Sequence, residues 1–239
     1  MAVNRDSNGY TIVFTIVMVA IVGAGLAGLA MSLKPIQDTN AKVKKKMDIL
    51  NSFGVEGVDR TNAEELYDKH ILKDQCKVLA FDGSVMEGED AFEADIRTEY
   101  RNKSLSITDR KYPLYVGTKN DSTFYIIPMV GVGLWDAIWG YVAVSDDKAT
   151  ISGAVFDHKG ETPGLGAEIK TPMFTDGYVG EKITDASGAY KQIVVVKDKS
   201  GSGINYKVDG ITGGTITSKG VEEMVDRTLK VYVKYFKKN

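Results

Sequence analysis

A long uncharged stretch near the amino terminus constrains the fold of this chain most. No Asp, Glu, Lys or Arg occurs from Tyr10 to Leu33. A helix needs about 20 mainly apolar residues to cross the hydrocarbon core of a bilayer, and this stretch is long enough. It exceeds the usual apolar region of a signal peptide and has no evident small-residue cleavage site. We therefore predict a retained transmembrane helix over residues 10–34, after a short tail of residues 1–9.

Small residues recur along one face of this predicted span. Ala20, Ala24, Gly28 and Ser32 follow one another at intervals of four residues. Small side chains at this spacing let two helices approach closely within lipid. The pattern favours packing against other membrane subunits, and a lone anchor with incidental small residues is the alternative.

The composition of the chain is that of a globular protein, and it argues against several classes of function. Of the 239 residues, 43% are hydrophobic and 26% are charged, which suits one packed domain with an appendage. The formal net charge of −2 argues against a nucleic-acid partner, because nucleic-acid-binding proteins usually present a basic face. The single cysteine, Cys76, cannot form an internal disulfide, a zinc site or an iron–sulfur cluster. We expect no metal site and interpret Cys76, at the start of a predicted strand, as structural.

The remainder of the chain predicts an α+β domain with a largely antiparallel sheet. We expect Pro35 to end the span, a juxtamembrane helix or linker to occupy residues 35–60, and the main domain to occupy residues 61–239. Short strands in succession with helices at the edges are typical of this fold class. The predicted strands cover residues 112–116, 123–130, 140–144, 150–156 and 192–196, and the predicted helices cover residues 36–53, 61–70, 89–101 and 218–237.

The last predicted helix is amphipathic, with apolar residues at helical spacing along one face. These residues are Val221, Val225, Thr228, Leu229, Tyr232 and Phe236.

A glycine-rich loop, from Asp209 to Ser218, leads into this helix. Its glycines allow positive φ and a close approach of the backbone to a ligand. The helix amino terminus that follows attracts anions through its free N–H groups and its dipole. The loop therefore predicts a phosphate site with the Thr215 hydroxyl as a reactive alcohol beside it. An ordinary turn with a helix cap is the alternative.

Two further segments could contact a flat ligand. Residues 131–140 place glycines beside Trp135, so that an aromatic ring could lie against a planar ligand, and the alternative is a strand-entry turn with Trp135 in the core. Residues 160–168 contain Pro163 and Gly164 in a tight turn. The Thr162 hydroxyl and nearby N–H groups could bond to ring heteroatoms, and the alternative is an ordinary capped turn.

The order of residues in the loop from Asp209 to Ser218 resembles the recognition motif of proteins that carry flavin mononucleotide (FMN) esterified to a threonine. The family pattern is Asp, then Ser or Thr, Gly, Ala, Thr, and then Thr or Ser two positions on. By this match Thr215 is the acceptor, and a separate flavin transferase would join its oxygen to the FMN phosphate. The chain departs from the pattern at Gly214, where the family usually has Ala; the change adds no bulk and loosens the loop.

Taken together, the three segments resemble the C subunits of sodium-translocating NADH:quinone reductases. The resemblance extends to Asn4-Arg5-Asp6-Ser7 and to residues 33–37. It implies that one group of residues lines the isoalloxazine ring and another surrounds the phosphate. The ring group is Trp135, Glu161, Thr162, Leu165 and Gly166, and the phosphate group is Gly213, Gly214, Thr217 and Ser218. Thr212 is a further expected cofactor-binding residue.

The resemblance implies an electron-transfer subunit with one covalent FMN per chain, in a complex whose other subunits bind NADH and quinone. It also implies a single pass through the bacterial inner membrane, with the large domain on the periplasmic side. Local charge favours the opposite orientation, because only Arg5 precedes the span and five lysines follow it between Lys34 and Lys46. Large domains can be translocated regardless of local charge.

Three alternatives remain at this point. The related G subunits of ion-translocating ferredoxin:NAD oxidoreductases also carry one span and a threonine-linked flavin. A membrane-anchored binding or scaffold protein would need no cofactor, and its glycine loops would be turns. A flavin enzyme acting alone would turn over a small substrate without partners.

Overall fold

The computed structural model describes residues 7–197 and 199–238 and divides the chain between Lys45 and Lys46 into two compact units. The α+β prediction is confirmed: a long apolar helix is followed by an antiparallel sheet domain and a carboxy-terminal helix. The predicted boundaries after residues 9, 34 and 60 remain predictions. The tetrapeptide from Asn4 to Ser7 lies outside the described residues except for Ser7.

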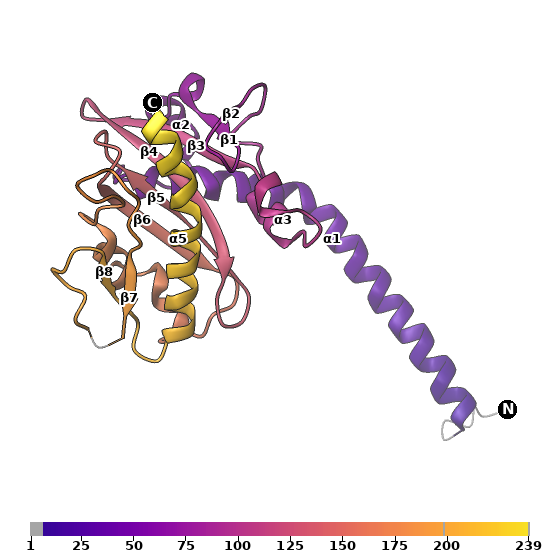
Figure 1. Cartoon of the computed structure of the whole chain (residues 1–239). Coiled ribbons are helices and arrows are strands. Elements are labelled where there is room, and N and C mark those ends of the chain that lie inside the picture. The colour runs from indigo at the N-terminus through magenta and orange to yellow at the C-terminus, as the bar shows by residue number, and fades with distance from the viewer. Residues whose placement is uncertain (1–6, 198, 239) are drawn as a thin grey trace. The chain divides into compact units, whose positions relative to one another are not determined.

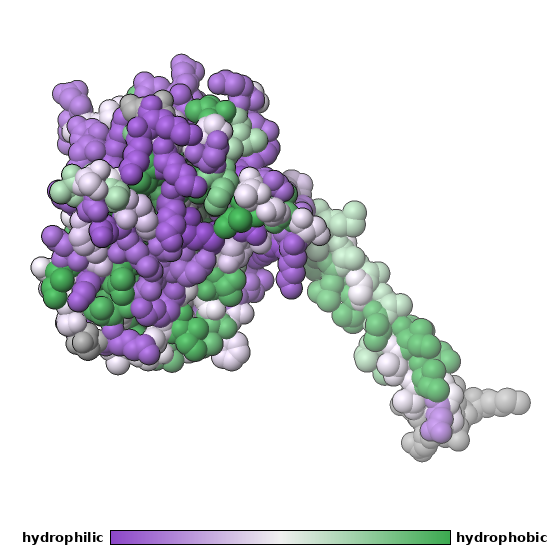
Figure 2. All heavy atoms as spheres, in the orientation of Figure 1, coloured by the Kyte–Doolittle hydropathy of each residue, from purple (hydrophilic) through white to green (hydrophobic). Residues whose placement is uncertain are grey.

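The first helix, α1 (Asn8–Ser52), contains the predicted span. It is the one helix among the described residues that is long and apolar enough to cross a membrane, and hydrophobic side chains cover most of its amino-terminal part (Figure 2). Pro35 lies inside this helix, so the predicted span and the predicted helix over residues 36–53 form one continuous helix. A proline removes one backbone donor and costs about 3 kcal/mol in a helix interior. The long helical segments on both sides offset that local cost.

The main domain is built on a six-stranded antiparallel sheet in the order β2-β1-β3-β4-β5-β6 (Figure 1). The four predicted strands of this sheet are present and longer than expected. The strands are β1 (Lys77–Leu79), β2 (Val85–Met86), β3 (Tyr112–Lys119), β4 (Ser122–Val132), β5 (Ala137–Val144) and β6 (Ile151–His158).

Each face of the sheet has its own hydrophobic core. Helix α5 (Thr215–Lys238) lies across one face (Figure 1), and all six predicted residues of its apolar stripe are buried. The end of α1 and helix α2 (Ala63–His70) pack against the other face through Ile49, Leu50 and Tyr67. Side chains alternate between the two faces along strand β5. Ile138 and Val142 lie in the core on the α5 side, and Tyr141 and Ala143 lie in the core on the opposite side.

The other elements surround this framework. The fifth predicted strand is β7 (Val194–Val196), which pairs in parallel with β8 (Lys207–Asp209) outside the main sheet. The remaining elements are helices α3 (Ile96–Arg101) and α4 (Pro172–Thr175) and the short helices η1 (Lys73–Gln75), η2 (Ile107–Asp109), η3 (Gly166–Lys170) and η4 (Asp176–Tyr178).

The predicted helix over residues 89–101 is wrong for its first half. Only α3 is helical, and the preceding residues form turns. The Asp90 carboxylate accepts the N–H of Phe92 at 2.7 Å. The Asp95 side chain accepts the N–H groups of Arg97 and Thr98, both at 3.1 Å. Aspartate side chains that bond to nearby backbone favour turns and helix caps over helix interiors.

The single cysteine, Cys76, is half-buried, and we expect its thiol to react slowly. Burial raises the pKa of Cys76, and the Sγ atom contacts the carbonyl oxygen of Leu72 at 3.4 Å. Because its pKa is raised, a smaller fraction of Cys76 is thiolate at a given pH than for an exposed cysteine, and the thiolate is the reactive form. Iodoacetamide at pH 8 should therefore modify the folded chain more slowly than the chain in urea. Equal rates in both states would contradict this expectation.

Candidate functional site

The loop before α5 is fixed by a buried serine. Helix α5 begins at Thr215, three residues earlier than predicted, so Thr215 stands in its first turn. The Ser218 hydroxyl accepts the N–H of Ile211 at 3.1 Å and donates to the carbonyl oxygen of Gly214 at 2.9 Å. Ser218 therefore holds the loop against the helix.

The first turn of α5 offers donors that no protein group uses. Among the described residues, no acceptor pairs with the N–H groups of Thr215, Ile216 and Thr217. The Thr215 side chain is half-buried, and its hydroxyl has no hydrogen-bond partner within residues 7–197 and 199–238. Lys197 and Lys219 border the small depression beside Thr215. Free N–H groups at a helix amino terminus together with lysines suit an anion such as a phosphate.

Two glycines bring the neighbouring loop close to this turn. Gly213 has φ +76°, and a Cβ atom there would lie 2.6 Å from Cδ2 of Leu165. A Cβ atom on Gly214 would lie 3.0 Å from Cγ2 of Ile211 and 3.1 Å from the carbonyl carbon of Leu165. The alanine usual in the resembling family would therefore require neighbouring atoms to move by a few tenths of an ångström. In this chain the glycine permits a closer approach of the Leu165 segment.

Glu161 joins the three predicted segments in one place. Its side chain is buried, with 5% exposure. The Oε2 atom accepts the hydroxyl of Thr217 at 2.6 Å, and Oε1 accepts the N–H of Trp135 at 2.9 Å.

The environment keeps the Glu161 carboxylate ionised. Burial raises its pKa, but the hydrogen bonds from Thr217 and from the turn around Trp135 outweigh burial, and the net pKa lies below the usual value. The carboxylate is also tightly enclosed. A Cβ atom on Gly133 would lie 2.5 Å from Oε1, and one on Gly166 would lie 2.6 Å from Oε2.

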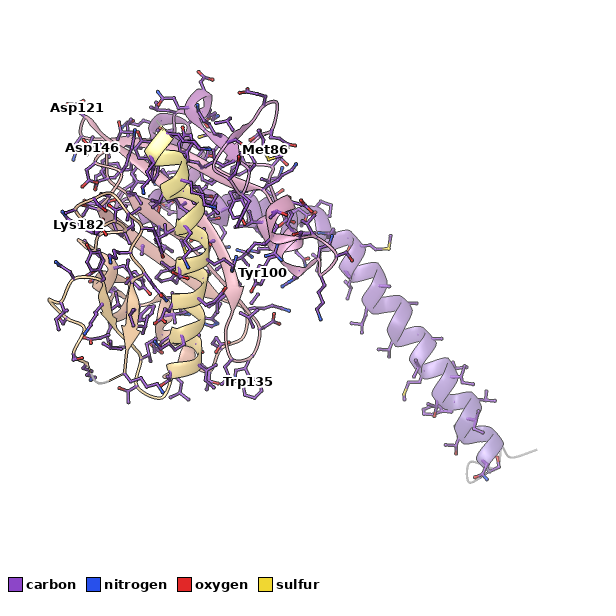
Figure 3. All side chains as sticks on the ribbon, viewed as in Figure 1. Met86, Tyr100, Asp121, Trp135, Asp146 and Lys182 are labelled. Carbon is purple, nitrogen blue, oxygen red and sulfur yellow. The ribbon has the colours of Figure 1, made fainter. Side chains whose placement is uncertain are left out.

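Trp135 lies on the surface, so its interpretation as a core residue is wrong. Its side chain is 68% exposed, in the turn between β4 and β5. Figure 3 shows it at the end of the domain where α5 begins. Its backbone N–H is held by Glu161, while its ring faces solvent. Other exposed apolar side chains on the same three segments are Leu134, Leu165 and Ile216, with exposures of 51%, 41% and 60%.

The predicted site residues thus form a buried set and a surface set. Glu161, Gly166, Gly214, Thr217 and Ser218 are buried. Thr162, Thr212 and Gly213 are exposed with Trp135 and Leu165, and Thr215 is half-buried. Sequence reasoning did not predict Leu134, Ile216, Lys197 or Lys219 as site residues. They could have been found as apolar or basic residues within or beside a glycine-rich segment.

The candidate site coincides with a known domain family. The model of the FMN-binding domain family matches residues 133–230, which contain the residues named above. The C subunit of the Na(+)-translocating NADH-quinone reductase of Haemophilus ducreyi is 30% identical over 231 residues, covering 92% of this chain and 88% of that protein. The chain belongs to this C-subunit family.

Other C subunits agree with this assignment. The subunit of Vibrio anguillarum is 30% identical, with 95% of this chain and 92% of the relative covered. The crystal structure of the C subunit from Parabacteroides distasonis has a TM-score of 0.74 and 41% identity, and it covers 85% of this chain and 96% of its own. NqrC of Shewanella oneidensis, at 22% identity and a TM-score of 0.68, shares the fold. This C-subunit homologue therefore matches its relatives over nearly their full length.

Proposed function

We propose that this chain is the FMN-carrying electron-transfer subunit of a Na⁺-translocating NADH:quinone reductase. Membership of the C-subunit family and the match to the FMN-binding domain support this function. The relatives reported above are named C subunits. We therefore do not propose the G-subunit function, the cofactor-free scaffold or a flavin enzyme acting alone.

We further propose that Thr215 carries the FMN through a phosphoester bond. The observation that carries this step is the Thr215 hydroxyl, which lacks a protein partner among the described residues and stands beside three unused N–H groups. In the attachment step, the Thr215 oxygen bonds to the FMN phosphorus, the bond from phosphorus to its leaving group breaks, and the hydroxyl proton is lost. A flavin transferase would supply the activated flavin. One FMN per chain follows, because the motif occurs once.

The residues around Thr215 fit the other parts of FMN. The free N–H groups and the nearby lysines would hold the phosphate. The exposed faces of Trp135 and Leu165 offer an apolar surface of the kind on which a flat ring rests. Thr162 and Thr212 are exposed on the same two loops as Leu165 and Thr215, and Gly166, Gly213 and Gly214 let these loops approach each other closely. FMN, when bound, accepts and releases electrons, and the protein positions it and tunes its potential.

The partners and location are part of the same proposal. Other subunits would bind NADH and quinone, and the span over residues 10–34 would pack against them in the bacterial inner membrane. Residues 35–60 would connect the span to the FMN domain over residues 61–239, on the periplasmic side. Covalent attachment suits a domain outside the cytoplasm, because a flavin made inside the cell and lost outside is not easily replaced.

Intact mass spectrometry tests this proposal directly. The full chain produced together with a flavin transferase should gain the mass of one FMN less one water, and its band on a denaturing gel should fluoresce. The chain produced without the transferase is the control and should show the bare mass. A colourless protein of bare mass, isolated from a working complex in native membranes, would refute the proposal.

A further inference from the structure

Glu161 is a buried charge that lacks a cationic partner. Within the described part of the chain, no Lys, Arg or His forms an ion pair with its carboxylate. Buried carboxylates are rare unless they are paired. Here the donors are the hydroxyl of Thr217 and the N–H group of Trp135. The net charge of the cluster therefore stays negative.

The donors come from segments that are far apart in sequence. Trp135 belongs to the turn between β4 and β5, Glu161 follows β6, and Thr217 lies in the first turn of α5. The carboxylate is their shared hydrogen-bond partner. Gly133 and Gly166 enclose it so closely that no Cβ atom would fit beside either oxygen. The side chain is therefore held in one arrangement, and the charge has a fixed place under the site.

We propose that Glu161 is a positioning residue that locks the three flavin-facing segments together, and that its fixed negative charge makes the bound FMN harder to reduce. This inference rests on the function proposed above and deepens it. Adding electrons to a ring near a fixed negative charge is electrostatically unfavourable, and burial weakens the screening of that charge by solvent. Glu161 thus has two effects: it holds the three segments in place, and its negative charge disfavours reduction of the FMN.

The electrostatic part is tested by Glu161→Gln in the full chain produced with a flavin transferase. Glutamine keeps the shape and one acceptor oxygen for the N–H of Trp135, but it removes the charge. We expect FMN to remain attached and its midpoint potential to become more positive. The expected change in the equilibrium constant with a reference dye is on the order of tenfold, or ~30 mV for a two-electron couple.

Two further variants separate charge from structure. Glu168→Gln removes a less buried carboxylate in the same loop, which accepts the N–H of Gly164 at 2.9 Å, and it should leave the potential unchanged. Glu161→Asp keeps the charge but shortens the bridge, so the potential should stay near that of the wild type. A flavinylated Glu161→Gln protein with an unchanged potential would overturn the electrostatic part. Equal shifts in the Gln and Asp variants would also overturn it.

The positioning part can be tested without any flavin. In a Thr215→Ala background, Glu161→Asp should speed amide hydrogen exchange at Trp135, because the shorter side chain withdraws the acceptor oxygen. Glu161→Gln, which keeps an acceptor oxygen, and Glu168→Gln should not. Unchanged exchange in Glu161→Asp would overturn this part. A wild-type chain that never acquires FMN would refute the proposed function instead. The hydrogen-exchange result does not depend on FMN, so it would still test the positioning role of Glu161.

Discussion

Replacing Thr215 by alanine is expected to abolish covalent FMN while the fold persists. The half-buried side chain makes no hydrogen bond in the described structure, so its loss removes little stabilising energy. Surface substitutions of this kind usually change stability by about 0.5 kcal/mol or less. After production with a flavin transferase, intact mass should fall from one FMN per chain to none. The melting temperature of the variant should match that of unmodified wild type.

Thr215→Ser is the matched control for this result. Serine keeps the hydroxyl in the first turn of α5, so it should still accept FMN, although the extra rotamer freedom of serine should slow the attachment. If the Thr215→Ala protein retains gel fluorescence, the FMN must be attached to another hydroxyl. Thr212 would be tested next, because it is exposed in the same loop.

Replacing Gly220 by alanine is expected to destabilise the domain and displace the start of α5. A Cβ atom at this position would lie 2.3 Å from the carbonyl oxygen of Val132 and 3.3 Å from Cδ1 of Ile138. The oxygen belongs to the backbone of β4, so helix and strand must separate. Alanine favours a helix over glycine by about 1 kcal/mol, but overpacking of this kind costs about 1–3 kcal/mol or more. We expect a net loss of stability and slower attachment of FMN.

Thermal unfolding of the full chain in detergent measures this effect. Gly160→Ala is the matched control, because a Cβ atom there would have no neighbour within 4 Å. The control should melt like the wild type. A Gly220→Ala protein that is as stable as the control would mean that α5 packs less closely on β4 than the structure indicates.

Several elements were predictable because their signals are local. The apolar stripe of α5, from Val221 to Phe236, repeats at helical spacing, and every one of its predicted positions is buried. Strands β3 to β6 are rich in β-branched and aromatic residues, and they were predicted with short boundaries. The helix over residues 89–101 failed because local hydrogen bonds from Asp90 and Asp95 opposed a helical pattern.

The candidate site was predictable only in part. The loop motif identified Thr215 as a candidate and the glycines beside it, since both are contiguous in sequence. The roles of Glu161 and Thr217 depend on a hydrogen bond of 2.6 Å between residues 56 positions apart. No local pattern encodes such a contact. For the same reason, the sequence left two positions open for Trp135, against a flat ligand or in the core, and only the structure shows that its ring is exposed.

The amino-acid sequence by itself determined an apolar helix long enough to cross a membrane, an α+β class and a hydroxyl beside a helix start, because composition, periodicity and turn chemistry act over a few residues. Tertiary structure alone decided that a buried carboxylate joins three distant segments and that an aromatic ring faces solvent. It also decided the parallel pairing of β7 with β8. The physical reason is that burial and long-range hydrogen bonds depend on which distant segments the packed chain brings into contact.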